Sequence, residues 1–100
     1  MKKKKDVKKM EFIGKTAIST GAASGMGLLF SENFAELGGN IVMCDVNETV
    51  LKEKVNEINA KGKGKAIGVI CDVRDYNDVC NARDKAIKEF GSIDVLVNFA

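Results

Sequence analysis

The segment TGAASGMG, residues 20–27, places three glycines within eight positions, directly after a short apolar run. A glycine-rich turn between a strand and a helix can bind a phosphate group. The helix N-terminus offers unpaired N–H groups, and the missing side chains let the ligand approach them. The alternative is structural, because Gly21 would permit a tight turn and Gly27 would permit close packing of helix on strand. The glycine pattern alone leaves both interpretations open.

The carboxylate of Asp45 is a second candidate binding group, because it ends the apolar run IVMCD (41–45), 24 positions after Gly21. An acidic side chain at the end of the second strand of a dinucleotide-binding unit can accept hydrogen bonds from both hydroxyls of an adenosine ribose. A helix cap is the alternative role for an aspartate here. In the ribose role this carboxylate would repel a 2′-phosphate, which favours NAD over NADP.

Polar groups also end the two later apolar runs, 65–73 and 93–98. Asp72 offers a side-chain acceptor and Val73 a backbone donor, a combination that can pair with the edge of an adenine; an acidic residue that merely leaves a strand is the alternative. Asn98 would lie beside the glycine loop if the strands take the order 3-2-1-4. In that order the first and fourth strands are neighbours whose connections leave in opposite directions, and ligands bind at such a point.

The residue types argue against a zinc site and against histidine-based catalysis. The chain has no histidine, and its three cysteines, Cys44, Cys71 and Cys80, show no C-x-x-C spacing. A zinc site is therefore not expected, and every histidine-based triad is excluded. Cys44 and Cys71 lie inside apolar runs, which favours buried, reduced thiols.

The positive net charge of +2 comes from the first residues, which include six lysines between positions 2 and 9. Without these lysines and Asp6, 10 basic residues face 13 acidic ones. A basic excess that is confined to a tail gives little support to a nucleic-acid-binding fold. We expect residues 1–9 to form a solvated, disordered arm; contact of this arm with an anionic surface or a nucleic acid is the alternative.

One hundred residues, 45% of them hydrophobic and 30% charged, suit a single globular core. No apolar run approaches the ~20 residues of a membrane span, and the chain does not begin with a signal-peptide pattern. We therefore expect a cytoplasmic protein without membrane contact.

Strand and helix patterns alternate along residues 15–98. Apolar runs predict strands at 15–19, 41–45, 65–73 and 93–98. The uninterrupted run 41–45 is expected to be buried on both faces, and 93–98 is expected to be a further buried strand. Three helices are predicted between them: from Met26 to Gly38, from the cap Asn47 to Gly62, and from Asp75, in a capping box with Asp78, to Gly91. Their expected buried faces are Met26, Phe30, Phe34 and Leu37; Leu51, Val55 and Ile58; and Val79, Ala82, Ala86 and Phe90. Such alternation predicts a parallel sheet with helices on both faces.

Together these segments resemble the first part of a classical short-chain dehydrogenase/reductase. The resemblance rests on Thr20-Gly21-x-x-x-Gly25-x-Gly27, Asp45, Asp72-Val73 and GSIDVLVNFA (91–100). It covers residues 10–100 and implies an α/β, Rossmann-type sheet of order 3-2-1-4, truncated after the fourth strand and thus an incomplete NAD-binding domain. The family's Asn-Asn-Ala-Gly motif is altered at Phe99 and the chain stops at Ala100, before its final glycine.

The resemblance also implies roles for individual residues. The loop would hold the pyrophosphate, Asp45 the ribose and Asp72-Val73 the adenine, while the motif after the fourth strand would line the cofactor. The residues assigned to cofactor binding are Gly21, Ser24, Gly25, Met26, Gly27, Asp45, Asp72, Val73, Asn98 and Ala100. The family's catalytic serine and Tyr-x-x-x-Lys pair would lie beyond residue 100. Tyr76, the only tyrosine, has Cys80 four positions on, so no catalytic residue and no metal ligand is assigned.

Relatives that prefer NADP usually carry a basic residue at the positions of Ser24 or Val46, both uncharged here. The expected function is hydride transfer between NAD and a small-molecule alcohol or carbonyl substrate, in a full-length protein that forms a homo-oligomer. Two alternatives stay open: a non-catalytic dinucleotide-binding module or redox sensor, and a truncated product without activity.

Overall fold

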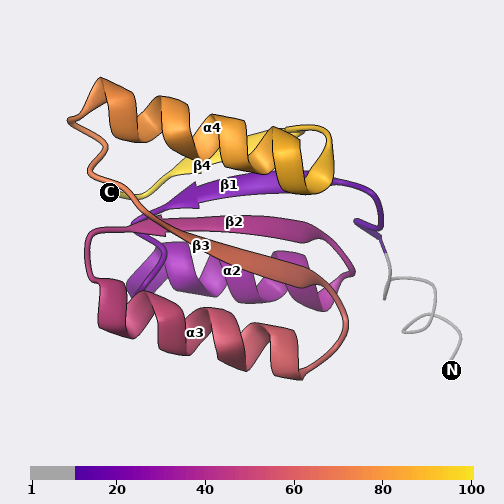
Figure 1. The fold of residues 1–100 in the computed structure, drawn as a ribbon. Helices are drawn as coiled ribbons and strands as arrows, with labels where there is room; N and C mark the ends of the chain where they lie inside the picture. Colours follow the sequence, from indigo (N-terminus) through magenta and orange to yellow (C-terminus); the bar gives the residue numbers. More distant parts are fainter. Residues whose placement is uncertain (1–10) are drawn as a thin grey trace, which may run out of the picture.

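A computed structural model describes residues 11–100 as a four-stranded parallel sheet covered by helices on both faces (Figure 1). The strands stand in the order β3-β2-β1-β4, which confirms the predicted α/β fold and its 3-2-1-4 order. The elements are β1 (Thr16–Thr20), α2 (Gly25–Glu36), β2 (Asn40–Asp45), α3 (Glu48–Ala60), β3 (Lys65–Ile70), α4 (Tyr76–Phe90) and β4 (Val95–Asn98). The predicted basic arm, residues 1–9, lies outside the described residues.

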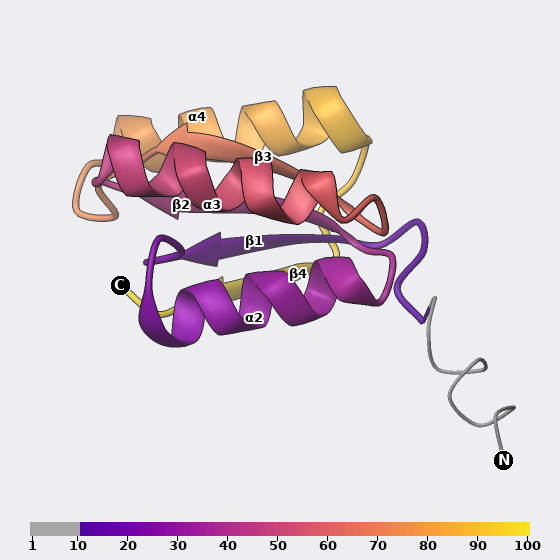
Figure 2. The ribbon, with the colours of Figure 1, turned by 90° about the horizontal axis from the view of Figure 1, so that it is seen from below.

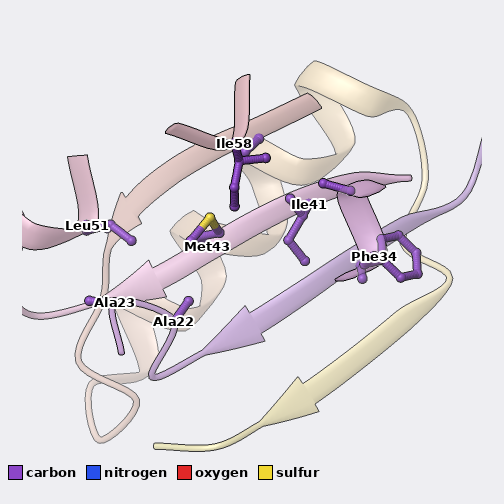
Figure 3. Close-up of a cluster of buried hydrophobic side chains, with 10 residues drawn as sticks. Ala22, Ala23, Phe34, Ile41, Met43, Leu51 and Ile58 are labelled. Carbon is purple, nitrogen blue, oxygen red and sulfur yellow. The ribbon is translucent and has the colours of Figure 1, made fainter. Parts of the chain in front are cut away.

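Apolar side chains form a core on each face of the sheet. Helices α2 and α3 cover one face, where Phe34, Met43 and Leu51 belong to a buried cluster (Figure 3). Helix α4 covers the other face, where Ala82 and Ala86 pack against the central strands. Strand β1 has a neighbouring strand on each side and helices on both faces, so every one of its residues is buried. The strands at the two edges of the sheet, β3 and β4, are partly exposed.

Parallel pairing brings the strand ends together at one edge. Thr20, the last residue of β1, lies opposite Cys44 of β2 on one side and opposite Asn98 of β4 on the other. The view in Figure 2 shows the C-terminal end of the chain beside the tip of β1 and the loop that enters α2. All four strand-to-loop junctions therefore face the same side of the molecule.

The buried face of α2 differs from the predicted one. Met26 is 63% exposed, so its assignment to the apolar stripe was wrong. The buried residues of this helix are Gly27, Ser31, Phe34 and Ala35, because two small residues let the helix approach β1 closely. The Gly27 carbonyl accepts hydrogen bonds from the hydroxyls of Ser19 and Ser31, at 3.2 and 2.8 Å, which ties the helix to the strand.

Two other expectations about burial are also corrected. Strand β4 covers Val95–Asn98 and is largely exposed rather than buried as expected: Leu96 is 67% exposed, because β4 lies at the edge of the sheet. Val79, placed on the buried face of α4, is 43% exposed, and that face is formed by Ala82 and Ala86. Strand β3 ends at Ile70 rather than Val73, since residues 71–75 turn into α4.

The predicted helix caps are confirmed at α3 and α4. The Asn47 side chain accepts from the Val50 N–H, and the Asp75 side chain accepts from the N–H groups of Asn77 and Asp78. The capping box at α4 is only half formed. The carboxylate of Asp78 accepts from the N–H of Asp72 at 3.0 Å rather than from its expected partner, the N–H of Asp75, which donates to the Asp72 carbonyl.

Candidate functional site

The candidate site is a cleft of about 200 Å³ at the C-terminal edge of the sheet. It lies where the connections from β1 and β4, neighbours in the sheet, leave the strands, which is the position where open α/β sheets bind ligands. Five of the ten residues assigned from the sequence line it: Gly21, Asp45, Asp72, Val73 and Ala100. Ser24, Gly25, Met26, Gly27 and Asn98 do not line the cleft itself, but belong to the loop, the first turn of α2 and the end of β4.

The glycines of the loop serve different purposes. A Cβ atom at Gly27 would lie 2.2 Å from the Gly21 carbonyl oxygen, so this glycine is required by packing within the protein. A Cβ atom at Gly25 would meet no heavy atom within 4 Å, although its φ of +58° favours glycine. The space in front of Gly25 is thus open. The structural interpretation therefore applies at Gly27, whereas Gly25 leaves room for a ligand.

Gly21 brings the loop against the end of β4. Its φ is +63°, and a Cβ atom there would lie 3.1 Å from the Ala100 nitrogen and 3.1 Å from the Phe99 carbonyl carbon. The loop and the segment after β4 therefore pack backbone against backbone. This contact positions Ala100 in the wall of the cleft.

The hydroxyl of Thr20 connects the first strand to the end of the fourth. It donates to the Asn98 side-chain oxygen and accepts from the N–H of Phe99 at 3.1 Å and, more weakly, from that of Ala100 at 3.4 Å. Asn98 thus lies beside the start of the glycine loop. Thr20 was part of the recognised segment but was not assigned a role, because its partners are almost 80 positions away in the sequence.

Asp45 holds the glycine loop and keeps acceptor capacity for a ligand. One carboxylate oxygen accepts from the Ala23 N–H at 2.9 Å, and the other accepts from the Asn47 N–H at 3.0 Å. The helix cap of α3 is Asn47, so the capping alternative for Asp45 is wrong. Since a carboxylate has about four acceptor positions, about two stay available for hydroxyl donors.

Helix α2 begins without a cap from a side chain. Ser24 is its N-cap residue, yet the Ser24 side chain makes no capping hydrogen bond, and the first turn contains no acidic residue. The other two described helices are both capped by a side chain and carry an acidic residue in their first turn. The first turn of α2 thus presents backbone N–H donors and the positive end of the helix dipole to the open space before Gly25.

Arg74, which the sequence analysis did not single out, binds the carboxylate of Asp72. Its backbone N–H and its Nε donate to Asp72 Oδ1, both at 3.0 Å, and its Nη2 donates to Oδ2 at 2.8 Å. These hydrogen bonds lower the pKa of Asp72 to about 2. An arginine two positions after an aspartate was the available signal, but the pairing depends on side-chain conformation.

Burial disfavours the thiolate form of the two cysteines near the cleft. Burial raises the pKa of Cys44 to about 12, with smaller contributions from Cys71 and Asp45. Burial also raises the pKa of Cys71, whose thiol lies in the same core cluster. Within residues 11–100, no group of three or more histidine, cysteine or acidic side chains is arranged to hold a metal ion. In the same part of the chain, no helix is long and apolar enough to cross a membrane.

The chain is similar in sequence and structure to known oxidoreductases. The family model for short chain dehydrogenases matches residues 15–100. The 7alpha-hydroxysteroid dehydrogenase of Escherichia coli (strain K12) is 37% identical over 87 residues, covering 87% of this chain and 34% of that enzyme.

Two solved structures share the fold at comparable identity. A short chain dehydrogenase/reductase from Burkholderia phymatum in complex with NAD aligns with a TM-score of 0.82 and 41% identity, over 86% of this chain and 30% of its own. L-Sorbose reductase from Gluconobacter frateurii, complexed with NADPH and L-sorbose, aligns with a TM-score of 0.85 and 33% identity, over 92% and 35%. The chain thus spans about a third of the length of these relatives.

Proposed function

Because this chain belongs to the short-chain dehydrogenase family, we propose that it forms the cofactor-binding portion of an NAD-dependent oxidoreductase acting on an alcohol or carbonyl substrate. The donors and acceptors of the site fit a dinucleotide. The uncapped first turn of α2 and the open space before Gly25 suit a pyrophosphate, and Asp45 suits the ribose hydroxyls. The nicotinamide supplies the hydride chemistry when it is bound, and the protein supplies its binding and orientation.

The remaining assigned residues complete the proposed site. Asp72 and the Val73 N–H would bind the adenine, and Asn98 and Ala100 would line the cofactor beside the glycine loop. Ser24, Met26 and Gly27 would contribute through their backbone in the first turn of α2. The substrate and its catalytic groups would come from the rest of a longer protein, in keeping with the share of the relatives' length that this chain spans.

The preference for NAD is carried by one observation, the Asp45 carboxylate in the wall of the cleft. One of the similar structures holds NAD and the other NADPH, so the fold alone does not select the cofactor. A 2′-phosphate carries nearly two negative charges, and Asp45 would repel it. Val46, also in the wall, and Ser24 supply no compensating positive charge.

A double variant, Asp45→Ser with Val46→Arg, tests the preference. The ratio of NAD affinity to NADP affinity should fall about 100-fold, which corresponds to about 3 kcal/mol. Isothermal calorimetry with both dinucleotides measures the ratio. It separates cofactor choice from a general loss of binding, since Asp45 also holds the Ala23 N–H. Asp84→Ser, on the exposed side of α4, is the matched control. An unchanged ratio in the double variant would contradict the assignment.

Hydride transfer itself is tested on the full-length protein. We expect reduction of NAD, followed by absorbance, with a panel of secondary alcohols that includes steroid and sugar alcohols. Binding of NAD without turnover of any substrate would instead favour the non-catalytic module or sensor. The homo-oligomeric state and the cytoplasmic location stay predictions from the sequence.

A further inference from the structure

Arg74 has no role in the proposed function so far, although its side chain is 86% exposed and lines the same cleft as Asp45 and Asp72. An exposed ion pair of this kind contributes little to stability. Its geometry is nevertheless specific, since the planar guanidinium binds both oxygens of one carboxylate through two different nitrogens. Because the ion pair of Arg74 and Asp72 contributes little to stability and lies in the wall of the cleft, its geometry points to a role in ligand recognition.

The hydrogen bonds leave Asp72 with an asymmetric set of acceptor positions. Oδ1 accepts from both the backbone N–H and the Nε of Arg74, which uses its two lone-pair directions. Oδ2 accepts only from Nη2, so one lone-pair direction stays available. The carboxylate is also fixed in rotation, because the fork of Arg74 binds both oxygens at once.

We propose that Arg74 is a positioning residue that fixes Asp72 as a single-point acceptor, so that the cleft selects 6-aminopurine over 6-oxopurine dinucleotides. This inference rests on the proposed function, in which Asp72 faces the adenine. An amino group at purine position 6 donates a hydrogen bond to the free lone pair of Oδ2. An oxo group at that position is an acceptor and meets a fixed anion, which leaves two acceptors facing each other.

The fixed orientation of the Asp72 carboxylate, and not its negative charge alone, adds to the discrimination that the Val73 N–H would provide against a ring N–H. A 6-oxopurine has an N–H donor at the neighbouring ring position, and a freely rotating carboxylate could turn toward it. Arg74 prevents that turn as long as its fork holds both oxygens. A lysine would keep the positive charge but would bind as a single point and lose the fork. The charge and the geometry of Arg74 can therefore be separated by substitution.

The test compares the affinities for NAD and for its hypoxanthine analogue, which has an oxo group at purine position 6 and an N–H donor at the neighbouring ring nitrogen. Calorimetry on the purified protein should give wild-type binding that favours NAD by at least about tenfold. In Arg74→Ala and Arg74→Lys the preference should fall to about threefold or less. Asp72→Asn, which offers both a donor and an acceptor, should also lose it. Arg83→Ala, an exposed arginine paired with Asp84, should keep the full preference.

The outcomes distinguish this inference from the proposed function. Wild-type protein that binds neither dinucleotide would refute the proposed function. Full preference retained in Arg74→Ala would overturn the role of Arg74 alone, and full preference retained in Arg74→Lys would show that charge rather than the fork is responsible. Equal loss of affinity for both dinucleotides would assign Arg74 a merely structural role and would also overturn the inference. Circular dichroism of each variant confirms that the fold is intact.

Discussion

Alanine substitutions at Gly25 and Gly27 should separate ligand binding from folding within one loop. At Gly27 the new Cβ atom would lie 2.2 Å from the Gly21 oxygen, 2.7 Å from its carbonyl carbon and 2.9 Å from the Thr20 oxygen. All three atoms belong to the backbone, so no side chain can move aside. Overpacking costs about 1–3 kcal/mol, and here we expect the upper end, partly offset by about 1 kcal/mol of gained helix propensity.

At Gly25 the same substitution meets no neighbouring atom within 4 Å. Its cost is the left-handed conformation at φ +58°, about 1–2 kcal/mol, less about 0.4–1 kcal/mol from the lower entropy of the unfolded chain. Gly62 is the matched control, because it has a φ of +72°, nothing within 4 Å, and a position after α3, away from the cleft. Stability should therefore change similarly, by about 1 kcal/mol, in Gly25→Ala and Gly62→Ala.

Urea denaturation measures the free energies of unfolding, and calorimetry with NAD measures binding. Gly27→Ala should lose about 2 kcal/mol of stability. Gly25→Ala should lose at least about tenfold in NAD affinity, because its methyl group fills the space that we assign to the pyrophosphate, whereas Gly62→Ala should bind NAD normally. Wild-type affinity in Gly25→Ala would refute that assignment. A stability of Gly27→Ala equal to that of Gly62→Ala would refute the packing argument.

Two further predictions concern the centre of the sheet. Thr20→Val removes the hydroxyl that joins β1 to Asn98, Phe99 and Ala100, and should lower the free energy of unfolding in urea by about 1–3 kcal/mol, whereas Thr20→Ser should stay close to wild type. Cys44 has its pKa raised to about 12 by burial, so between pH 9 and 12 the native state keeps a proton that the unfolded state loses. The contribution of the protonated Cys44 thiol to stability is therefore fully present below pH 9. As the pH rises above 9, the free energy of unfolding should fall by up to about 1.4 kcal/mol per pH unit. Urea midpoints from pH 8 to 11 measure this slope, and an equally steep slope in Cys44→Ala would contradict its assignment to this thiol.

The alternation of strands and helices and the caps Asn47 and Asp75 followed from apolar runs and the polar residues between them, because these signals are local. The order of the strands is not a local property, and it followed from the family resemblance. The face of α2 could not be read in the same way. Hydrophobic periodicity counts large apolar residues, whereas Gly27 and Ser31 are buried because they are small. The exposure of Leu96 depends on what lies beside β4 and not on the residues of β4 itself.

The candidate binding residues followed from the glycine spacing, from the polar groups at the strand ends and from the family resemblance, and five of them, Gly21, Asp45, Asp72, Val73 and Ala100, line one cleft. Their hydrogen-bond partners were not predictable. The contact of Asp45 with the Ala23 N–H and the fork of Arg74 on Asp72 depend on loop geometry and side-chain rotamers, which no spacing in the sequence encodes.

The hydrogen bonds of Thr20 also bear on how the chain folds during its synthesis on the ribosome. Thr20 and Asn98 are separated by 78 positions, so at about 5–20 residues per second the partner is synthesised roughly 4–16 s after the strand that needs it. During that interval β1 can pair with β2, but beyond Thr16, which exchanges hydrogen bonds with Asp94, its other edge lacks the strand that covers it, and the glycine loop lacks the backbone against which Gly21 packs. A nascent chain stalled before Val95 would therefore expose the buried edge of β1 to other strands.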